Sequence, residues 1–267
     1  MISAVVPFYA NPELHTHARF SLPLCLEPLL AHEKMKEIIL VDDGSTINLE
    51  INASPKIRYY RIAHHGVGNA RNIGIAKATQ PYLLILDSDI IVSKQLIDAF
   101  VDNLNGGADI ACVGYVETYI NSIWDKCEEL YWRYNESLPG KWWLSCGCMM
   151  TKREVFDAMR FESETLSDED TVFSRKAKES NLKTVTLPLT AKHVFAATLQ
   201  ALRRKWFYGG KRVALSRTRT LAQTVKSTLL SPIFALKLAA KYRYPMLIPF
   251  ITIRSLTFFE GFTSAFK

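Results

Sequence analysis

Two aspartates one residue apart, Asp87 and Asp89, directly follow the apolar run at residues 82–86. A short apolar run bounded by Pro81 and polar residues is typical of a buried strand in a parallel sheet. At the carboxyl end of such a strand, the pair would face the crevice in which open α/β sheets bind ligands. Neighbouring carboxylates repel each other unless a cation lies between them, so the pair predicts a divalent-cation site. Alternatively, the two aspartates could cap the turn that follows the strand without binding a ligand.

A second acidic pair, Asp42 and Asp43, ends the apolar run at residues 37–41 and is followed by a glycine and a serine. The carboxyl ends of parallel strands meet at one edge of a sheet, so these carboxylates are expected near Asp87 and Asp89. There they would accept hydrogen bonds from a pyrimidine N–H and from ribose hydroxyls. An Asx turn, a tight bend built from Asp, Gly and Ser, fits the same pattern.

A glycine-rich turn, Gly66-x-Gly68-x-x-Arg71, follows a third expected strand and enters a helix. Its backbone amides and Arg71 could face a diphosphate. The pattern also resembles a dinucleotide-binding fingerprint, with the acid Asp87 at the expected distance. However, Arg71 stands where the third glycine would allow close packing of helix on strand, and a dehydrogenase needs no acids on other strand ends. A nucleoside diphosphate is therefore favoured over a dinucleotide.

The segment Ser167-Asp168-Glu169-Asp170 has the form of a helix capping box. The same segment could instead hold a carboxylate general base at a helix N-terminus, aimed at an acceptor hydroxyl. His193 follows an expected strand at 183–187 and is either a packed side chain, a metal ligand or a contact to the diphosphate. For the segment at 167–170 and for His193, these alternatives stay open at this point.

The chain becomes basic and apolar beyond about residue 200. Residues 203–212 combine cations, aromatic residues and a glycine pair, which is typical of an amphipathic surface. They also suit a hinged lid in which Arg203 and Arg204 neutralise departing phosphates.

The expected elements alternate between strands and helices, which predicts an α/β fold with a mostly parallel central sheet flanked by helices. Strands are expected at residues 3–8, 37–41, 57–62, 82–86, 110–116, 142–150 and 183–187. Helices are expected at 21–36, 66–78, 119–137 (packed over the sheet) and 167–180.

The composition is that of a globular protein, with 267 residues, of which 22% are charged and 48% hydrophobic. A formal net charge of +7 indicates an anionic partner. The five cysteines are odd in number and irregularly spaced, so buried thiols are expected rather than a disulfide framework. Residues 2–6 lack the features of a signal peptide, so a cytoplasmic location is expected.

Taken in order, these motifs resemble family 2 glycosyltransferases over about residues 1–212. The segments that carry the resemblance are Val5-Val6-Pro7-Phe8-Tyr9, Val41-Asp42-Asp43-Gly44-Ser45, Gly68-Asn69-Ala70-Arg71-Asn72-Ile73-Gly74, Leu86-Asp87-Ser88-Asp89 and Ser167-Asp168-Glu169-Asp170-Thr171 with Arg175. The resemblance implies the GT-A fold, a nucleotide-sugar donor, Mn²⁺ or Mg²⁺, and inversion at the anomeric carbon.

The resemblance also implies a role for each matching residue. Asp170 would be the catalytic base, and Asp87 and Asp89 would hold the metal, with His193 as a further candidate ligand. The donor would contact Pro7, Asp42, Asp43, Arg71, Asp87, Arg203 and Arg204; the acceptor would lie near Trp142, Cys146, Gly147 and Glu169. Processive synthases carry Gln-x-x-Arg-Trp, whereas this chain has Gln200-Ala-Leu-Arg203-Arg-Lys-Trp206, so transfer of one sugar is expected.

The tail at residues 213–267 is predicted to form a separate helical part after a catalytic domain at 1–212. Its apolar stretches, 229–240 and 244–262, are interrupted by charges and are too short to span a bilayer. Apolar faces bordered by Lys and Arg are typical of helices lying on an anionic membrane surface, although a buried helical pair would have a similar pattern.

The sequence therefore predicts an inverting, metal-dependent glycosyltransferase, peripheral or monotopic on the cytoplasmic face of a membrane. It would move one sugar, from a UDP-sugar in preference, to a hydroxyl of a glycan or a lipid-linked acceptor in cell-surface glycan synthesis. Nucleic acid is not expected as a partner, because the cations cluster beside apolar residues rather than along a stacking platform. A non-catalytic nucleotide-sugar or nucleic-acid binding module is the alternative.

Overall fold

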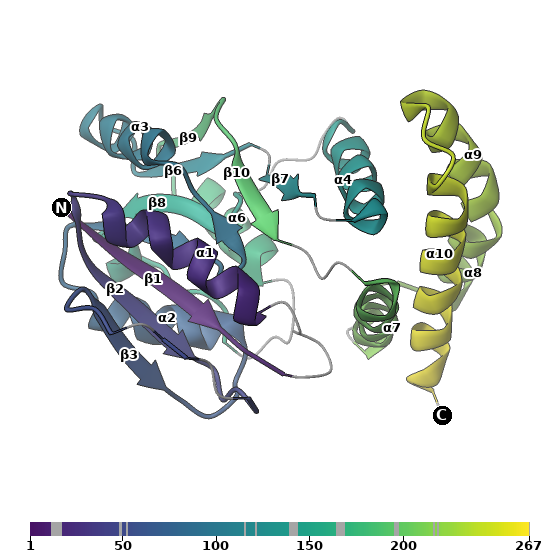
Figure 1. The fold of residues 1–267 in the computed structure, drawn as a ribbon, viewed down its shortest axis with the longest axis horizontal. Helices are drawn as coiled ribbons and strands as arrows, with labels where there is room; N and C mark the ends of the chain where they lie inside the picture. Colours follow the sequence, from purple (N-terminus) through teal and green to yellow (C-terminus); the bar gives the residue numbers. More distant parts are fainter. Residues whose placement is uncertain are drawn as a thin grey trace. The chain divides into compact units, whose positions relative to one another are not determined.

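The structure is a computed structural model that describes residues 1–11, 18–47, 50–51, 53–114, 116–120, 122–138, 144–163, 169–194, 198–215, 217 and 219–266. The chain forms two compact units (Figure 1): residues 1–117 with 139–194, and residues 118–138 with 195–267. The expected boundary at residue 212 differs from this division, because the first basic helix after residue 198 belongs to the second unit.

The first unit is built on a seven-stranded sheet in the order β3-β2-β1-β4-β8-β6-β9. These strands are β1 (Ile2–Phe8), β2 (Met35–Asp42), β3 (Ile57–Arg61), β4 (Tyr82–Leu86), β6 (Ile110–Val113), β8 (Cys148–Lys152) and β9 (Thr184–Leu187). The first four run parallel, β9 runs parallel to β6, and β8 is antiparallel to both its neighbours. The expected mostly parallel α/β sheet is confirmed.

Both faces of the sheet are covered, which explains why its central strands are apolar throughout. In β1, Ala4 and Val6 point into the core cluster shared with α1 (Ala18–Ala31) and α3 (Lys94–Asn105), whereas Val5 points into the opposite cluster. The opposite cluster is completed by α2 (Val67–Lys77), α5 (Val155–Ala158) and α6 (Glu169–Glu179). Figure 1 shows α1 and α2 on opposite sides of β1 and β2.

A small second sheet has the order β5-β10-β7, with β5 (Ile90–Ile91), β10 (Ala191–Val194) and β7 (Val116–Tyr119). The single strand expected at 110–116 was therefore wrong: β6 lies in the large sheet and β7 in the small one. The strand expected from residue 142 begins only at Cys148, and residues 139–143 lie outside the described part of the chain.

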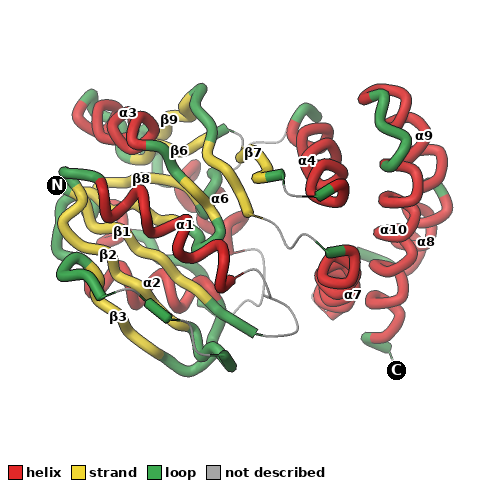
Figure 2. The backbone as a smooth tube through the Cα atoms, viewed as in Figure 1, coloured by secondary structure: helices red, strands yellow, loops and turns green. Residues whose placement is uncertain are grey.

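The second unit is helical and consists, among described residues, of five helices (Figure 2). They are α4 (Ile123–Glu136), α7 (Leu199–Leu215), α8 (Leu221–Leu229), α9 (Ser231–Tyr242) and α10 (Leu247–Ser264). Their core joins Cys127 and Leu130 of α4 to Trp206 of α7 and Phe250 of α10. The buried side of α4 thus belongs to this helical core, not to the sheet core with which it was expected to pack.

Two glycines allow α7 and α10 to cross closely. A Cβ atom at Gly210 would overlap the backbone of Phe258, and one at Gly261 would overlap the backbone of Phe207. The Trp206 ring meets Phe250 edge-on beside this crossing, and its Nε1 donates to the buried Glu128 at 3.1 Å. In the part of the chain that the structure describes, none of the helices is both long and apolar enough to cross a bilayer.

Candidate functional site

The acidic strand ends lie at one edge of the large sheet. Asp42 is the last residue of β2 and pairs in register with Phe8 of β1, while Asp87 comes directly after β4, which is also parallel to β1. This parallel pairing places both strand ends at the carboxyl edge of the sheet. The two acidic strand ends thus lie at one edge of the sheet, with β1 between them.

Arg71 is the centre of this edge. Its side chain reaches from α2 and is buried, with 1% of the residue exposed. Nη2 donates to Asp87 Oδ1 at 2.8 Å, and Nη1 donates to Asp170 Oδ1 at 2.7 Å. Nη1 also reaches Glu169 Oε1 at 3.4 Å. One guanidinium thus fixes the end of β4 against the start of α6, two segments separated by more than 80 residues.

Arg71 neutralises only part of the negative charge of the carboxylates around it. Burial lowers the pKa of Arg71, but Asp87 and Asp170 outweigh that effect and hold its pKa above the usual value, so it stays charged. Burial raises the pKa of Asp87, and Asp89 and Asp170 raise it further against the opposing effect of Arg71. Burial, followed by Asp170, likewise raises the pKa of Glu169. Several carboxylates thus share one buried cation, and a second cation would stabilise the cluster.

Gly147 packs directly against the Asp87 carboxylate. The Asp87 amide donates to the Gly147 carbonyl oxygen at 2.9 Å, and a Cβ atom at position 147 would overlap Asp87 Oδ2. The neighbouring Cys146 is fully buried, with its Sγ 3.9 Å from the Asp170 carbonyl oxygen. The five cysteines are all buried and unpaired, as expected, and the thiol of Cys146 packs behind Asp170 rather than facing solvent.

Asp89 and His193, two of the residues considered as metal ligands, are brought together by the small sheet. His193 of β10 pairs with Ile90 of β5, and the Val194 amide donates to the Asp89 carbonyl oxygen at 2.7 Å. His193 Nε2 consequently lies 3.1 Å from Asp89 Oδ2, with both side chains about a quarter exposed. Mn²⁺ and Mg²⁺ prefer carboxylate oxygens to imidazole nitrogens, so this pair would bind either ion less tightly than two carboxylates. The pair still fits a divalent cation that also binds phosphate oxygens.

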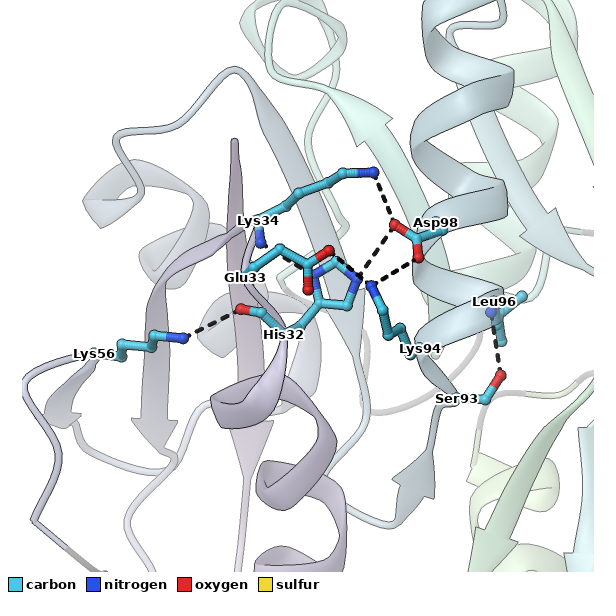
Figure 3. A network of polar contacts seen from close by, with 8 residues as sticks. All are labelled: His32, Glu33, Lys34, Lys56, Ser93, Lys94, Leu96 and Asp98. Atoms are coloured by element: carbon cyan, nitrogen blue, oxygen red, sulfur yellow. Dashed lines mark hydrogen bonds and ion pairs between the residues drawn. The ribbon is translucent and has the colours of Figure 1, made fainter.

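A second polar cluster, His32, Glu33 and Asp98, offers three potential metal ligands within 4.8 Å among the described residues. Figure 3 shows that lysines already occupy it: Lys34 Nζ lies 2.8 Å from Asp98 Oδ1, and Lys94 Nζ lies 2.7 Å from Glu33 Oε1. The cluster precedes β2, at the edge of the sheet opposite Asp87.

The histidine in this cluster is also oriented wrongly for a metal. His32 Nδ1 accepts a hydrogen bond from the Lys34 amide at 3.2 Å, and burial lowers the His32 pKa, so the neutral ring carries its proton on Nε2. That atom faces Asp98 Oδ1 at 3.5 Å and has no lone pair to offer. The cluster therefore holds α1, β2 and α3 together and is not a metal centre.

Asp42 and Asp43 shape the loops that follow β2. Asp42 Oδ1 accepts from the Ser45 amide at 2.7 Å, and Oδ2 accepts from the Tyr59 hydroxyl at 2.7 Å. Asp43 accepts from the amides of His65 and Gly66, both at 2.9 Å. The turn-building interpretation of these acids is correct. It does not exclude ligand binding, because each carboxylate oxygen can accept a second hydrogen bond.

An aromatic pair that the sequence reasoning did not single out lies beside these acids. The rings of Tyr9 and His64 stack with centroids 4.3 Å apart, and His64 Nδ1 lies 2.8 Å from Asp43 Oδ2. Tyr9 directly follows β1, two residues after Pro7. This position at the carboxyl end of a strand is the sequence feature that could have indicated a site residue. The pair offers a flat surface of the kind on which nucleobases stack.

The structure does not bring the remaining predicted residues into this cluster. Trp142, Ser167 and Asp168 lie outside the described residues. Arg203 and Arg204 lie on α7 in the second unit.

The family model described as glycosyl transferase family 2 matches residues 3–166, more than half of the chain. The chain belongs to this family. Its match ends just before α6, so the segment that carries Asp170 follows the matched region directly.

Curated relatives are also glycosyltransferases. Glycosyltransferase GlyG of Streptococcus pneumoniae is 34% identical over 124 residues, which is 43% of this chain and 39% of that protein. An uncharacterized glycosyltransferase of Rickettsia conorii is 30% identical over 102 residues, which is 36% of this chain and 16% of that protein. The chain thus matches well under half the length of both relatives.

Among solved structures, S. aureus TarS residues 1–349 in complex with UDP-GlcNAc superposes with a TM-score of 0.53 at 14% identity, covering 98% of this chain and 90% of that one. The same protein in complex with UDP gives a TM-score of 0.51 at 16% identity over the same shares. These likenesses confirm the expected GT-A fold.

Proposed function

We propose that this family 2 protein is an inverting glycosyltransferase that uses Asp170 as its general base. The observation that carries the proposal is the Arg71 bridge, since it ties Asp170 to Asp87 at the edge of the sheet where the other acidic strand end also lies. Displacement at an anomeric carbon with inversion needs a base near the acceptor hydroxyl, opposite the leaving diphosphate, and Asp170 would take that place if the diphosphate lies beside Asp87.

The donor is proposed to be a nucleotide sugar, with UDP-sugars preferred. Asp42 and Asp43 would accept hydrogen bonds from the base and ribose, near Pro7, and the stacked Tyr9 and His64 rings would flank the base. A neighbour in fold, TarS, has been solved with UDP-GlcNAc and with UDP, which supports this donor class.

Mn²⁺ or Mg²⁺ would be held by Asp89 and His193, with Asp87 Oδ2 nearby, and would neutralise charge on the departing diphosphate. Arg71 does not fill that role in our proposal, because its Nη1 and Nη2 atoms already pair with Asp170 and Asp87. It is a positioning residue for Asp87 and Asp170. That Arg203 and Arg204 contact the donor stays a prediction from the sequence, since both lie on α7 in the second unit.

Asp170 is suited to take the acceptor proton. Its side chain is 45% exposed, and only Oδ1 enters the Arg71 ion pair, so we assign proton transfer to Oδ2. The acceptor oxygen would form its bond to the anomeric carbon as the bond to the diphosphate breaks. Glu169 would border the acceptor together with Trp142. Gly147 would position the Asp87 carboxylate, and Cys146 would pack against the backbone of Asp170.

The acceptor is proposed to be a hydroxyl of a glycan or lipid-linked glycan, met at the cytoplasmic face of a membrane. The test is a panel of nucleotide sugars screened by thermal shift with and without Mn²⁺, followed by assignment of the anomeric configuration of the product. A metal-dependent shift with one UDP-sugar and an inverted product is the expected result. Binding without transfer to any acceptor would favour the non-catalytic module, and retention of configuration would refute the mechanism.

A further inference from the structure

Helices α8 and α9, which are consecutive in the chain (Figures 1 and 2), carry several exposed apolar side chains. Leu230 N donates to Lys226 O and Phe234 N donates to Leu230 O, both at 3.1 Å, so Leu230 ends α8 and begins α9 with a helical backbone conformation. The surface, here called the α8–α9 face, consists of Lys226, Leu229, Leu230, Ile233, Leu236 and Lys237.

The apolar members of this face are far more exposed than a helical core needs. Leu229 is 73% exposed, Ile233 66%, Leu236 58% and Leu230 48%. The opposite side of α9 already supplies the residues of the helical core, Ala235, Leu238 and Ala239. The spacing of three and four residues therefore gives α9 two apolar sides, and the second one stays exposed among the described residues of this unit.

The charge around the face indicates what covers it. Residues 199–267 contain 13 Lys and Arg and a single acid, Glu260. Lys226 and Lys237 lie at the two ends of the face, Lys226 three residues before Leu229 and Lys237 directly after Leu236. A second copy of the chain would bring these cations against one another, whereas a nucleic acid would leave the four aliphatic side chains without an apolar contact.

An anionic bilayer satisfies both parts of the face at once. Aliphatic side chains enter the boundary between headgroups and acyl chains, and lysine stems extend so that their ammonium groups reach lipid phosphates. We propose that the α8–α9 face docks this protein on an anionic phospholipid surface, with Leu229, Ile233 and Leu236 inserted. This inference concerns the second unit and stands whether or not the donor site works as proposed.

The test is flotation of the full chain with phosphatidylglycerol-containing vesicles and with pure phosphatidylcholine vesicles. Binding to the anionic vesicles only, weakened by added salt, is the expected result. The double variant Ile233→Ser with Leu236→Ser should bind at least about tenfold more weakly. The pair Lys226→Gln with Lys237→Gln should lose about tenfold on anionic vesicles.

Ile123→Ser is the matched control, because Ile123 is a comparably exposed isoleucine (51%) on a different helix, α4. Its binding should equal that of the unaltered protein, and circular dichroism should show every variant folded. Equal binding to neutral vesicles, absence of binding, or an equal loss in Ile123→Ser would overturn the proposal. A dimer in solution that Ile233→Ser with Leu236→Ser dissociates would assign the face to a second copy instead.

Discussion

Arg71 provides the sharpest perturbation of the site. Replacing it with methionine keeps an apolar chain of similar length but removes the buried cation that pairs with Asp87 and Asp170. Breaking a buried ion pair by removing one partner typically costs about 3–5 kcal/mol. Because Asp170 is 45% exposed and water screens it, the lower end, about 3 kcal/mol, is the expected loss. At two to four degrees for each kcal/mol, Tm should fall by about 6–12 °C.

The pH dependence separates charge from packing in that variant. Without Arg71, the pKa of Asp87 and Glu169, already raised by burial, must rise further in the folded state. A carboxyl whose folded pKa lies above its unfolded value binds protons more tightly when folded, so stability is gained as the pH falls through the folded pKa. The deficit of Arg71→Met should therefore be largest at pH 7 and shrink toward about pH 5.

The assay is thermal unfolding of Arg71→Met, Arg71→Lys and the unaltered protein at several pH values. Arg71→Lys keeps the charge but cannot span both carboxylates with two nitrogens, so it should recover part of the stability and little of the activity. A deficit for Arg71→Met that is the same at pH 5 and pH 7 would contradict this reasoning. It would instead assign the loss to packing, such as the contact of Arg71 with the Phe161 ring at 5.0 Å.

Three further predictions concern the groups around Arg71. Gly147→Ala should displace the Asp87 side chain, destabilise the fold by about 1–3 kcal/mol and weaken metal-dependent donor binding. Asp89→Ala should abolish the dependence of donor affinity on Mn²⁺, measured by calorimetry, and an unchanged metal dependence would exclude Asp89 as a ligand. Tyr9→Ala should weaken UDP binding by about 1–3 kcal/mol of lost stacking without altering thermal stability to the same degree; equal affinity would remove Tyr9 from the base pocket.

Much of the first unit could be predicted from its sequence, because the relevant signals are local. The apolar runs that end in Asp42 and Asp87 are buried strands of one parallel sheet, and this alone fixes the edge at which the acids meet. The role of Arg71 was harder to predict. A glycine-rich turn is typical of a phosphate-binding loop. The direction of the arginine side chain, however, depends on how α2 packs on the sheet, and Arg71 pairs with three carboxylates, one after β4 and two at the start of α6.

The helical unit shows where local signals end. The amphipathic pattern of α4 predicts a buried side but cannot name the partner, which comes from α7 and α10, more than 60 residues away. The break between β6 and β7 was missed for a related reason. The run at 110–116 has the apolar pattern of one strand. Its division between two sheets follows from pairing with β9 and β10, which come later in the chain.

The proposal for the chemistry depends most directly on Asp170. In Asp170→Asn the side chain keeps its size and can still meet Arg71 through its carbonyl oxygen, but it can no longer accept a proton from the acceptor. We predict that transfer of the sugar falls by at least about a hundredfold while the affinity for UDP-sugar with Mn²⁺ is unchanged. Turnover in this variant close to that of the unaltered protein would contradict the assignment of Asp170 as the base.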